Sequence, residues 1–77
     1  MSNQKALDLG HRVRKLLVDN DRSLAWLSRN ISVSYNTLLK RMQDPGDFTQ
    51  HELVEIAAAF NVEVEWLQTG IRIEDAA

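Results

Sequence analysis

The chain has 77 residues, no cysteine, 44% hydrophobic and 26% charged residues, and a formal net charge of −2. A chain of this length has room for one hydrophobic core, because small domains bury only about 60% of the surface that the unfolded chain exposes. Without cysteine it forms neither a disulfide nor a thiolate metal site. The composition is typical of a globular domain and argues against a disordered chain. We therefore expect one domain that is stabilised by packed apolar side chains.

Membrane insertion and secretion are not expected. The longest apolar run, residues 56–60, is far shorter than the roughly 20 residues that a transmembrane helix needs. The N-terminus has no apolar segment of the kind found in signal peptides. We expect a cytoplasmic protein without a membrane partner.

Charge is distributed unevenly along the chain. Residues 1–43 carry eight basic and three acidic side chains, a balance of +5, whereas residues 44–77 carry one basic and eight acidic side chains, a balance of −7. Such asymmetry is typical of a protein with one half facing a polyanion, although the negative total lacks the basic excess common in nucleic-acid binders. Solvated helix faces explain the same pattern equally well.

The first of five segments with helical periodicity carries one apolar stripe. Its members, at positions i, i+4, i+7 and i+8, are Leu9, Val13, Leu16 and Leu17. We expect this helix to end near Val18, because an Asp-Asn-Asp cluster follows.

The second and third segments are short and close together. They cover residues 24–31 and 35–42, and Ser23 and Ser34 precede them as N-caps, whose hydroxyls accept hydrogen bonds from free backbone N–H groups. The apolar side chains that share an inner face are Leu24, Leu27 and Ile31 in the second segment and Leu38 and Met42 in the third. The sequence therefore predicts two short helices with a tight turn between them.

Helix-terminating residues stand before the fourth segment and after the fifth. After Asp-Pro-Gly-Asp at residues 44–47, Thr49 and Glu52 form a T-x-x-E capping box for a fourth helix, and Asn61 is its predicted C-cap. Its inner stripe consists of Leu53, Ile56, Ala57 and Phe60. A fifth helix over residues 64–69 is predicted to end at Gly70. Residues 71–75 alternate in polarity, which fits a short strand or a frayed tail. The predicted fold class is all-α.

Residues 23–38 resemble the helix-turn-helix of the lambda-repressor-like family, which includes Cro and phage repressor proteins. The residue types that match in order are the capping Ser23, apolar Leu27, small Ser28, the small turn residue Ser32, Val33-Ser34 and apolar Leu38. Residues 41–60 also resemble phage-type members, so that the resemblance covers roughly residues 9–70. Two positions depart from the family pattern, since Ser32 stands where glycine is usual and Trp26 where a polar residue is usual. The resemblance implies a compact five-helix domain over residues 1–70, with a tail over 71–77.

If that fold holds, the third helix turns its outer face to the bases in the major groove of DNA. The predicted base-reading residues are Tyr35, Asn36, Leu39 and Lys40. The predicted phosphate contacts, several of them near helix N-termini, are Arg22, Ser23, Ser34, Thr37 and Arg41. Ordinary exposed polar residues and capping serines are the alternative roles, and Arg41 has an ion pair with Asp44 or Asp47 as its alternative. Three basic side chains of the first segment are expected either to flank the phosphates or to form a solvated helix face: Arg12, Arg14 and Lys15.

The resemblance implies a bacterial transcription regulator, either Cro-like or a short phage immunity repressor, that binds an operator in double-stranded DNA. An excisionase-type recombination cofactor and an antitoxin-type protein-binding module are the alternatives. Trp26 and Trp66 are expected in the core, and the Trp66 region is also a candidate homodimer contact in the C-terminal half. His11 and His51 stand alone, so that we expect no catalytic residues, metal, cofactor or small-molecule ligand.

Overall fold

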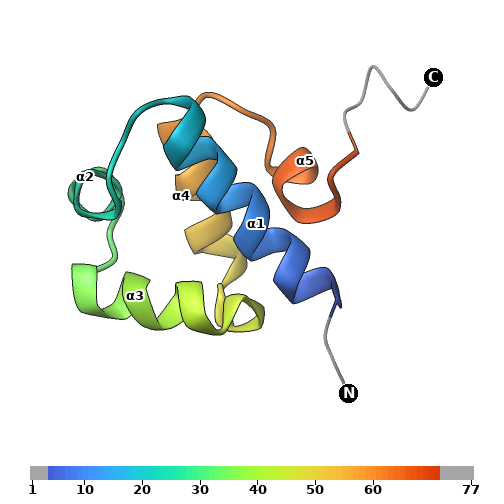
Figure 1. Ribbon diagram of the computed structural model, residues 1–77, viewed down its shortest axis with the longest axis horizontal. Helices are drawn as coiled ribbons and strands as arrows, with labels where there is room; N and C mark the ends of the chain where they lie inside the picture. Colours follow the sequence, from blue (N-terminus) through green and yellow to red (C-terminus); the bar gives the residue numbers. More distant parts are fainter. Residues whose placement is uncertain (1–3, 72–77) are drawn as a thin grey trace.

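The computed structural model describes residues 4–71, and within this range every regular element is a helix (Figure 1). The elements are α1 (Gln4–Asp19), α2 (Leu24–Asn30), α3 (Tyr35–Gln43), the short 3-10 helix η1 (Pro45–Asp47), α4 (Gln50–Ala59) and α5 (Val64–Thr69). The predicted all-α fold class is confirmed, and the five predicted helices end within about one residue of their expected ends. The strand considered for residues 71–75 falls, apart from Ile71, outside the described residues.

The predicted N-caps account for where three of the helices begin. Ser23 accepts from the N–H of Trp26 at 3.0 Å, Ser34 accepts from the N–H of Thr37 at 3.2 Å, and Thr49 accepts from the N–H of Glu52 at 3.1 Å. The carboxylate of Glu52 in turn accepts from the N–H of Thr49 at 3.0 Å, which completes the capping box. These local bonds satisfy backbone donors that would otherwise be unpaired at the helix ends.

Helices α1 and α4 end in the same way, with a left-handed residue after the last turn. Asp21, after α1, and Asn61, after α4, both adopt left-handed backbone conformations, with φ of 52° and 56°. In each case the following N–H reaches back to a carbonyl of the last turn, as in the 2.9 Å bond from Val62 to Ala57. Asn61 was predicted as the C-cap of α4, whereas the helix cap is Phe60 and Asn61 occupies the left-handed position after it.

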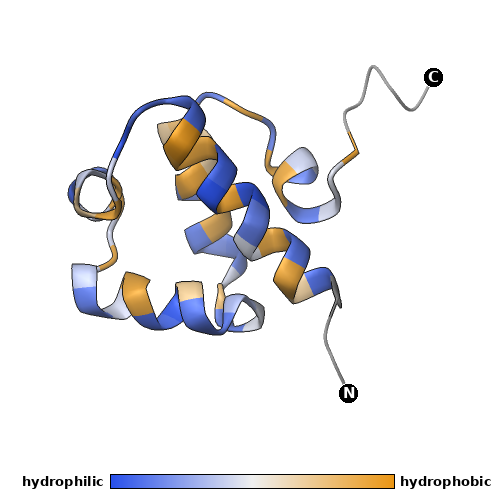
Figure 2. Ribbon diagram, in the orientation of Figure 1, coloured by the Kyte–Doolittle hydropathy of each residue, from blue (hydrophilic) through white to orange (hydrophobic). Residues whose placement is uncertain are grey.

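The core draws one fully buried side chain from every α-helix. These side chains are Val13, Leu27, Leu38, Ile56 and Leu67, from α1 to α5 in order. Because each helix also carries polar positions (Figure 2), its apolar side is what packs against the others. No helix within residues 4–71 is long and apolar enough to cross a membrane.

Helix α1 lies across the centre of the molecule and is fixed at two places (Figure 1). On one side Gly10 faces the 3-10 helix so closely that an added Cβ would stand 2.8 Å from Cγ of Pro45. On the other side Arg12 donates from Nε to the carbonyl oxygen of Leu67 at 2.7 Å and from Nη2 to that of Gln68 at 2.8 Å. Arg12 is therefore engaged by α5 and does not project from α1 into solvent.

Candidate nucleic-acid interface

Helix α3 lies along one side of the molecule, with one face packed and the other open to solvent. Leu38 is fully buried and Met42 is partly buried against the core, which fixes the inner face of the helix. The four predicted base-reading residues, Tyr35, Asn36, Leu39 and Lys40, are all exposed. Their spacing of i, i+1, i+4 and i+5 places them on a single stripe. We call these four residues the α3 outer face.

This outer face combines apolar and hydrogen-bonding groups. Tyr35 has 46% and Leu39 has 37% of its surface exposed, although both are large hydrophobic side chains. Asn36 offers an amide that both donates and accepts, and Lys40 offers a charged donor. An exposed helix face with this mixture can make directional bonds and apolar contacts with the same partner.

The connection between α2 and α3 is short and bent. Figure 1 looks nearly along the axis of α2, whereas α3 lies across the view, so that the chain changes direction sharply over residues 31–34. Ile31 and Val33 are buried in the connection, while Ser32 and Ser34 are exposed. The hydroxyl of Ser34 also donates to Oγ1 of Thr37 at 3.0 Å, which holds both side chains at the start of α3.

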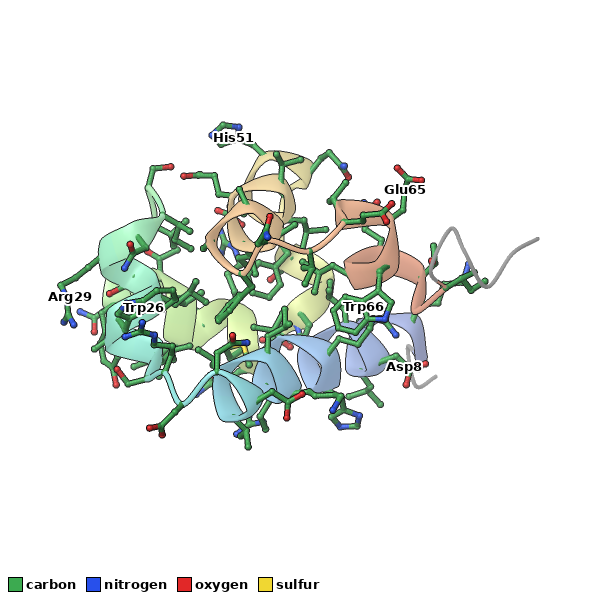
Figure 3. All side chains as sticks on the ribbon, turned by 90° about the horizontal axis from the view of Figure 1, so that it is seen from above. Asp8, Trp26, Arg29, His51, Glu65 and Trp66 are labelled. Atoms are coloured by element: carbon green, nitrogen blue, oxygen red, sulfur yellow. The ribbon has the colours of Figure 1, made fainter. Side chains whose placement is uncertain are left out.

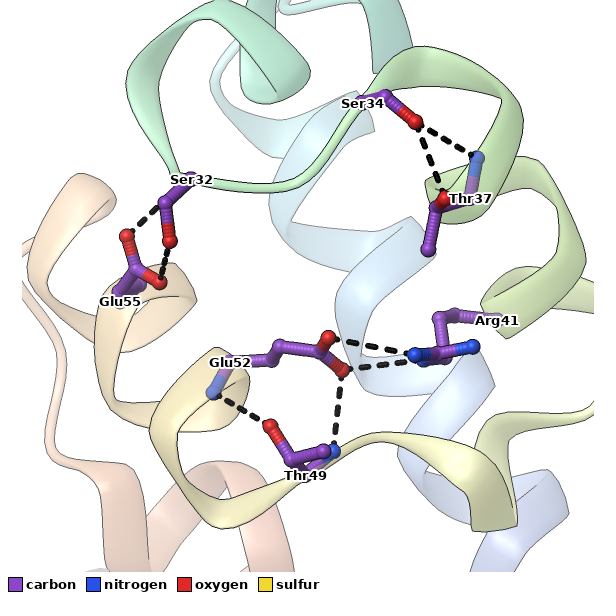
Figure 4. Close-up of polar contacts among 7 residues, drawn as sticks. All are labelled: Ser32, Ser34, Thr37, Arg41, Thr49, Glu52 and Glu55. Carbon is purple, nitrogen blue, oxygen red and sulfur yellow. Dashed lines mark hydrogen bonds and ion pairs between the residues drawn. The ribbon is translucent and has the colours of Figure 1, made fainter.

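Sequence reasoning missed the contact that holds this connection. The N–H of Ser32 donates to Oε2 of Glu55 on α4 at 2.8 Å, and the hydroxyl donates to Oε1 at 2.6 Å (Figure 4). His51 adds a third group, with Nε2 at 3.2 Å from Oε1. The two hydrogen bonds from Ser32, above all that of its hydroxyl, lower the pKa of Glu55 below its ordinary value.

The serine in this turn fits without backbone strain. Among residues 4–71 the only residues with positive φ are Asp21, Asn61 and Gly70, so that Ser32 has a backbone conformation open to any amino acid. Glycine is therefore not required at this position. The serine side chain supplies a donor that glycine would lack.

The ion pair of Arg41 differs from the one that the sequence suggested. Its partner is neither Asp44 nor Asp47 but Glu52, with Nε at 3.0 Å from Oε1 and Nη2 at 3.4 Å from Oε2 (Figure 4). The sequence indicated Glu52 only as a capping residue. In the structure the same carboxylate caps α4 and binds Arg41. The hydrogen bond to Glu52 raises the pKa of Arg41. The guanidinium, predicted to bind phosphate, is thus held by a carboxylate in the free protein.

Arg22 and Trp26 form a small cluster at the start of α2. The guanidinium carbon of Arg22 lies 4.7 Å from the centre of the Trp26 ring, and this ring lies 5.5 Å from that of Phe60. Trp26 is partly buried against the core, as expected, and the guanidinium of Arg22 lies over its ring beside the Ser23 cap. Trp66 is likewise partly buried against the core, on α5 (Figure 3).

The three basic residues of α1 that the sequence suggested as phosphate neighbours are only partly available. Arg12 is bound to α5, and Lys15 pairs with Asp19 at 2.8 Å, while Arg14 is exposed. Arg29, on α2, projects away from the body of the molecule (Figure 3). Apart from Lys40, which belongs to the α3 outer face, the described cations closest to this face in sequence are Arg29 and Arg41.

Within residues 4–71 no three His, Cys, Asp or Glu side chains gather in a way that could hold a metal ion. Comparison of the chain with protein-family models, with curated proteins and with solved structures found no match. An inference of function consequently depends on the fold and on the chemistry of the surface.

Proposed function

We propose that this protein binds double-stranded DNA sequence-specifically, with α2 and α3 as a helix-turn-helix and α3 in the major groove. The observation that carries the proposal is the α3 outer face, where Asn36, Lys40 and two large apolar side chains are exposed on a helix anchored by buried Leu38. A major groove about 12 Å wide admits one α-helix, and its base edges present both hydrogen-bonding groups and thymine methyl groups. The mixture of groups on this face suits both.

Each residue of the α3 outer face has a distinct proposed role. The amide of Asn36 bonds two edge atoms of an adenine, and the apolar Leu39 packs on a thymine methyl group. Lys40 donates to the acceptors of a guanine or to a phosphate, and Tyr35 contributes a hydroxyl or a ring contact at the start of the helix. This division makes Asn36 the sharpest test of base recognition.

The proposed phosphate contacts surround this face. Ser23, Ser34 and Thr37 lie at the N-terminal ends of α2 and α3, where hydroxyl and backbone N–H donors position a duplex without reading its sequence. Arg22 supplies a cation that lies over the ring of Trp26. Arg41 reaches a phosphate only by exchanging the carboxylate of Glu52 for it, so that we assign it the weakest contribution.

The biological role that we propose is that of a Cro-like regulator or short phage repressor, which acts in the bacterial cytoplasm by occupying an operator. A homodimer formed through the Trp66 region would place two copies of α3 on successive half-sites about one helical turn apart. Sedimentation of the protein alone and with duplex tests this proposal. A complex with one protein chain on each enriched duplex would exclude the dimer.

Selection of bound sequences from a random duplex library tests the function directly, with Asn36→Ala and Lys40→Ala compared at two salt concentrations. Asn36→Ala is expected to abolish preference at particular base pairs, whereas Lys40→Ala is expected to weaken binding and to lower the salt dependence. Lys5→Ala is the matched control, because it removes the same charge from an exposed position on α1 that has no proposed contact with DNA.

Two outcomes would contradict the proposal. If no sequence is enriched by the unmodified protein, the DNA-binding proposal fails, and a protein partner bound through the acidic second half becomes the better explanation. If a sequence is enriched but neither Asn36→Ala nor Lys40→Ala changes any preference, α3 is not the reading helix.

A further inference from the structure

Two carboxylates of α4 hold the two ends of the α3 segment. Glu52 and Glu55 are three residues apart, which places them on the same side of α4. Glu55 accepts two bonds from Ser32, two residues before the N-cap of α3, while Glu52 binds Arg41 in the last turn of α3 (Figure 4). Helix α4 therefore binds the α3 segment just before the first residue of α3 and again near its last residue.

These polar contacts do what the apolar contacts of α3 cannot do alone. Leu38 and Met42 pack the helix against the core, but the hydrophobic effect that drives this packing is not directional. Hydrogen bonds of 2.6 to 3.0 Å from Ser32 and Arg41 are directional and fix both ends. Glu52 is itself held by the capping box through the N–H of Thr49, so that its carboxylate has a defined position.

Recognition of base edges depends on such positioning. A side chain that reads a base must be placed to within about half an ångström, and this precision comes from the groups that support it. Neither Glu52 nor Glu55 belongs to the α3 outer face, and a carboxylate is repelled by phosphate. Any benefit of these residues to DNA recognition therefore acts through the position of α3.

We propose that Glu52 and Glu55 are positioning residues that set the sequence discrimination of α3 by holding both of its ends. This inference rests on the proposed DNA-binding function. It assigns a role in recognition to two acidic residues that, by charge alone, would only weaken binding to DNA.

The test measures affinity for two duplexes, one carrying the sequence enriched from the random library and one with a single base pair changed. The variants are Glu55→Gln and Glu52→Gln, and Glu63→Gln at the start of α5 is the control with the same change in charge. Each positioning variant is expected to reduce the ratio of the two affinities by about tenfold, the discrimination that one good base contact provides. The control is expected to keep the ratio while binding both duplexes slightly more tightly.

Ser32→Ala is a milder change that distinguishes a loss of positioning from a loss of folding. It removes the hydroxyl donor to Glu55 but leaves the bond from the backbone N–H of Ser32. It is expected to lower the ratio less than Glu55→Gln does, and the double variant is expected to be no worse than Glu55→Gln alone. Circular dichroism confirms that each variant is folded before its affinities are compared.

The outcomes distinguish this inference from the function on which it rests. If the unmodified protein enriches no sequence, the proposed function fails. If it discriminates between the two duplexes and folded Glu55→Gln and Glu52→Gln keep the same ratio as Glu63→Gln, the function stands and the positioning role is wrong.

Discussion

The guanidinium of Arg12 on α1 donates from Nε to the carbonyl oxygen of Leu67 on α5 at a distance of 2.7 Å. A second bond, from Nη2 to the carbonyl of Gln68, uses the same side chain at the same helix end. Helix α5 has only six residues, and an isolated helix of that length is not stable in water. Its existence therefore depends on the buried Leu67 and on this cation at its C-terminal carbonyls.

Replacing Arg12 by methionine tests this dependence. The variant keeps an unbranched apolar stem and removes both charged hydrogen bonds, so that the free energy of unfolding should fall by about 1–3 kcal/mol. Urea denaturation measures the change. Arg14→Met on the same helix is the control, because Arg14 is exposed, and equal effects of the two substitutions would contradict the role given to Arg12.

Gly10→Ala should destabilise the protein although alanine favours helix. The substitution gains about 1 kcal/mol in helix propensity, but its Cβ would stand 2.8 Å from Cγ of Pro45, and overpacking of this kind costs about 1–3 kcal/mol. Thermal unfolding of Gly10→Ala, Pro45→Ala and the double variant measures the coupling. The double variant should recover part of the loss, and a more stable Gly10→Ala protein would show that α1 does not approach the 3-10 helix so closely.

Thr49→Ala should lower the free energy of unfolding by about 1 kcal/mol, since the hydroxyl caps the first turn of α4. Thr49→Ser keeps the capping oxygen and should retain most of the stability. Chemical denaturation of both variants measures these changes in the free energy of unfolding. A serine variant as unstable as the alanine variant would attribute the effect to the lost methyl group instead of to the cap.

Acid should remove part of the stability through Glu52. Burial raises the pKa of this carboxyl, but the hydrogen bonds from Arg41 and from the N–H of Thr49 outweigh it, so that the folded-state pKa lies below the ordinary value of 4.5. The unfolded chain therefore takes up the proton first, and the contribution is complete above 4.5 and is lost as the pH falls through the lower folded-state pKa.

The measurement is urea denaturation of the unmodified protein and of Glu52→Gln across this pH range. The difference in free energy of unfolding between them should be largest near neutral pH and should shrink below the ordinary pKa of 4.5. In an Arg41→Met background the same comparison should give a smaller difference, because the partner is gone. A difference that is constant with pH would contradict the assignment.

Local signals in the sequence were sufficient to predict the helices. The stripe containing Leu9 and Val13 is buried as expected, and the hydroxyls of Ser23, Ser34 and Thr49 cap the helices that they were assigned to. Such features are determined within three or four neighbouring residues, which is why a single sequence reveals them. The exposure of the α3 outer face followed from the same periodicity, because burial of Leu38 determines which residues point outward.

Contacts between distant segments were not predictable in this way. Arg12 shares its helix with other basic residues, and nothing in the local pattern distinguishes it as the one that reaches α5. Ser32 and Glu55 are 23 residues apart, and their bond depends on how α4 crosses the preceding turn. For Arg41 the sequence favoured the nearer Asp44 and Asp47, but the fold brings Glu52 closer. Sequence proximity is a weak guide for long, flexible side chains.

The bond between Arg12 and Leu67 joins segments 55 residues apart, and this has a consequence for how the protein is made. Translation produces α1 first and α5 last among the described helices. Until Leu67 has left the ribosome, the apolar stripe of α1 lacks part of its cover and Arg12 has no carbonyls to bind. We therefore expect the domain to close only after synthesis of its last helix, in one cooperative step. A nascent chain halted before that point would expose apolar surface, which chaperones and proteases recognise.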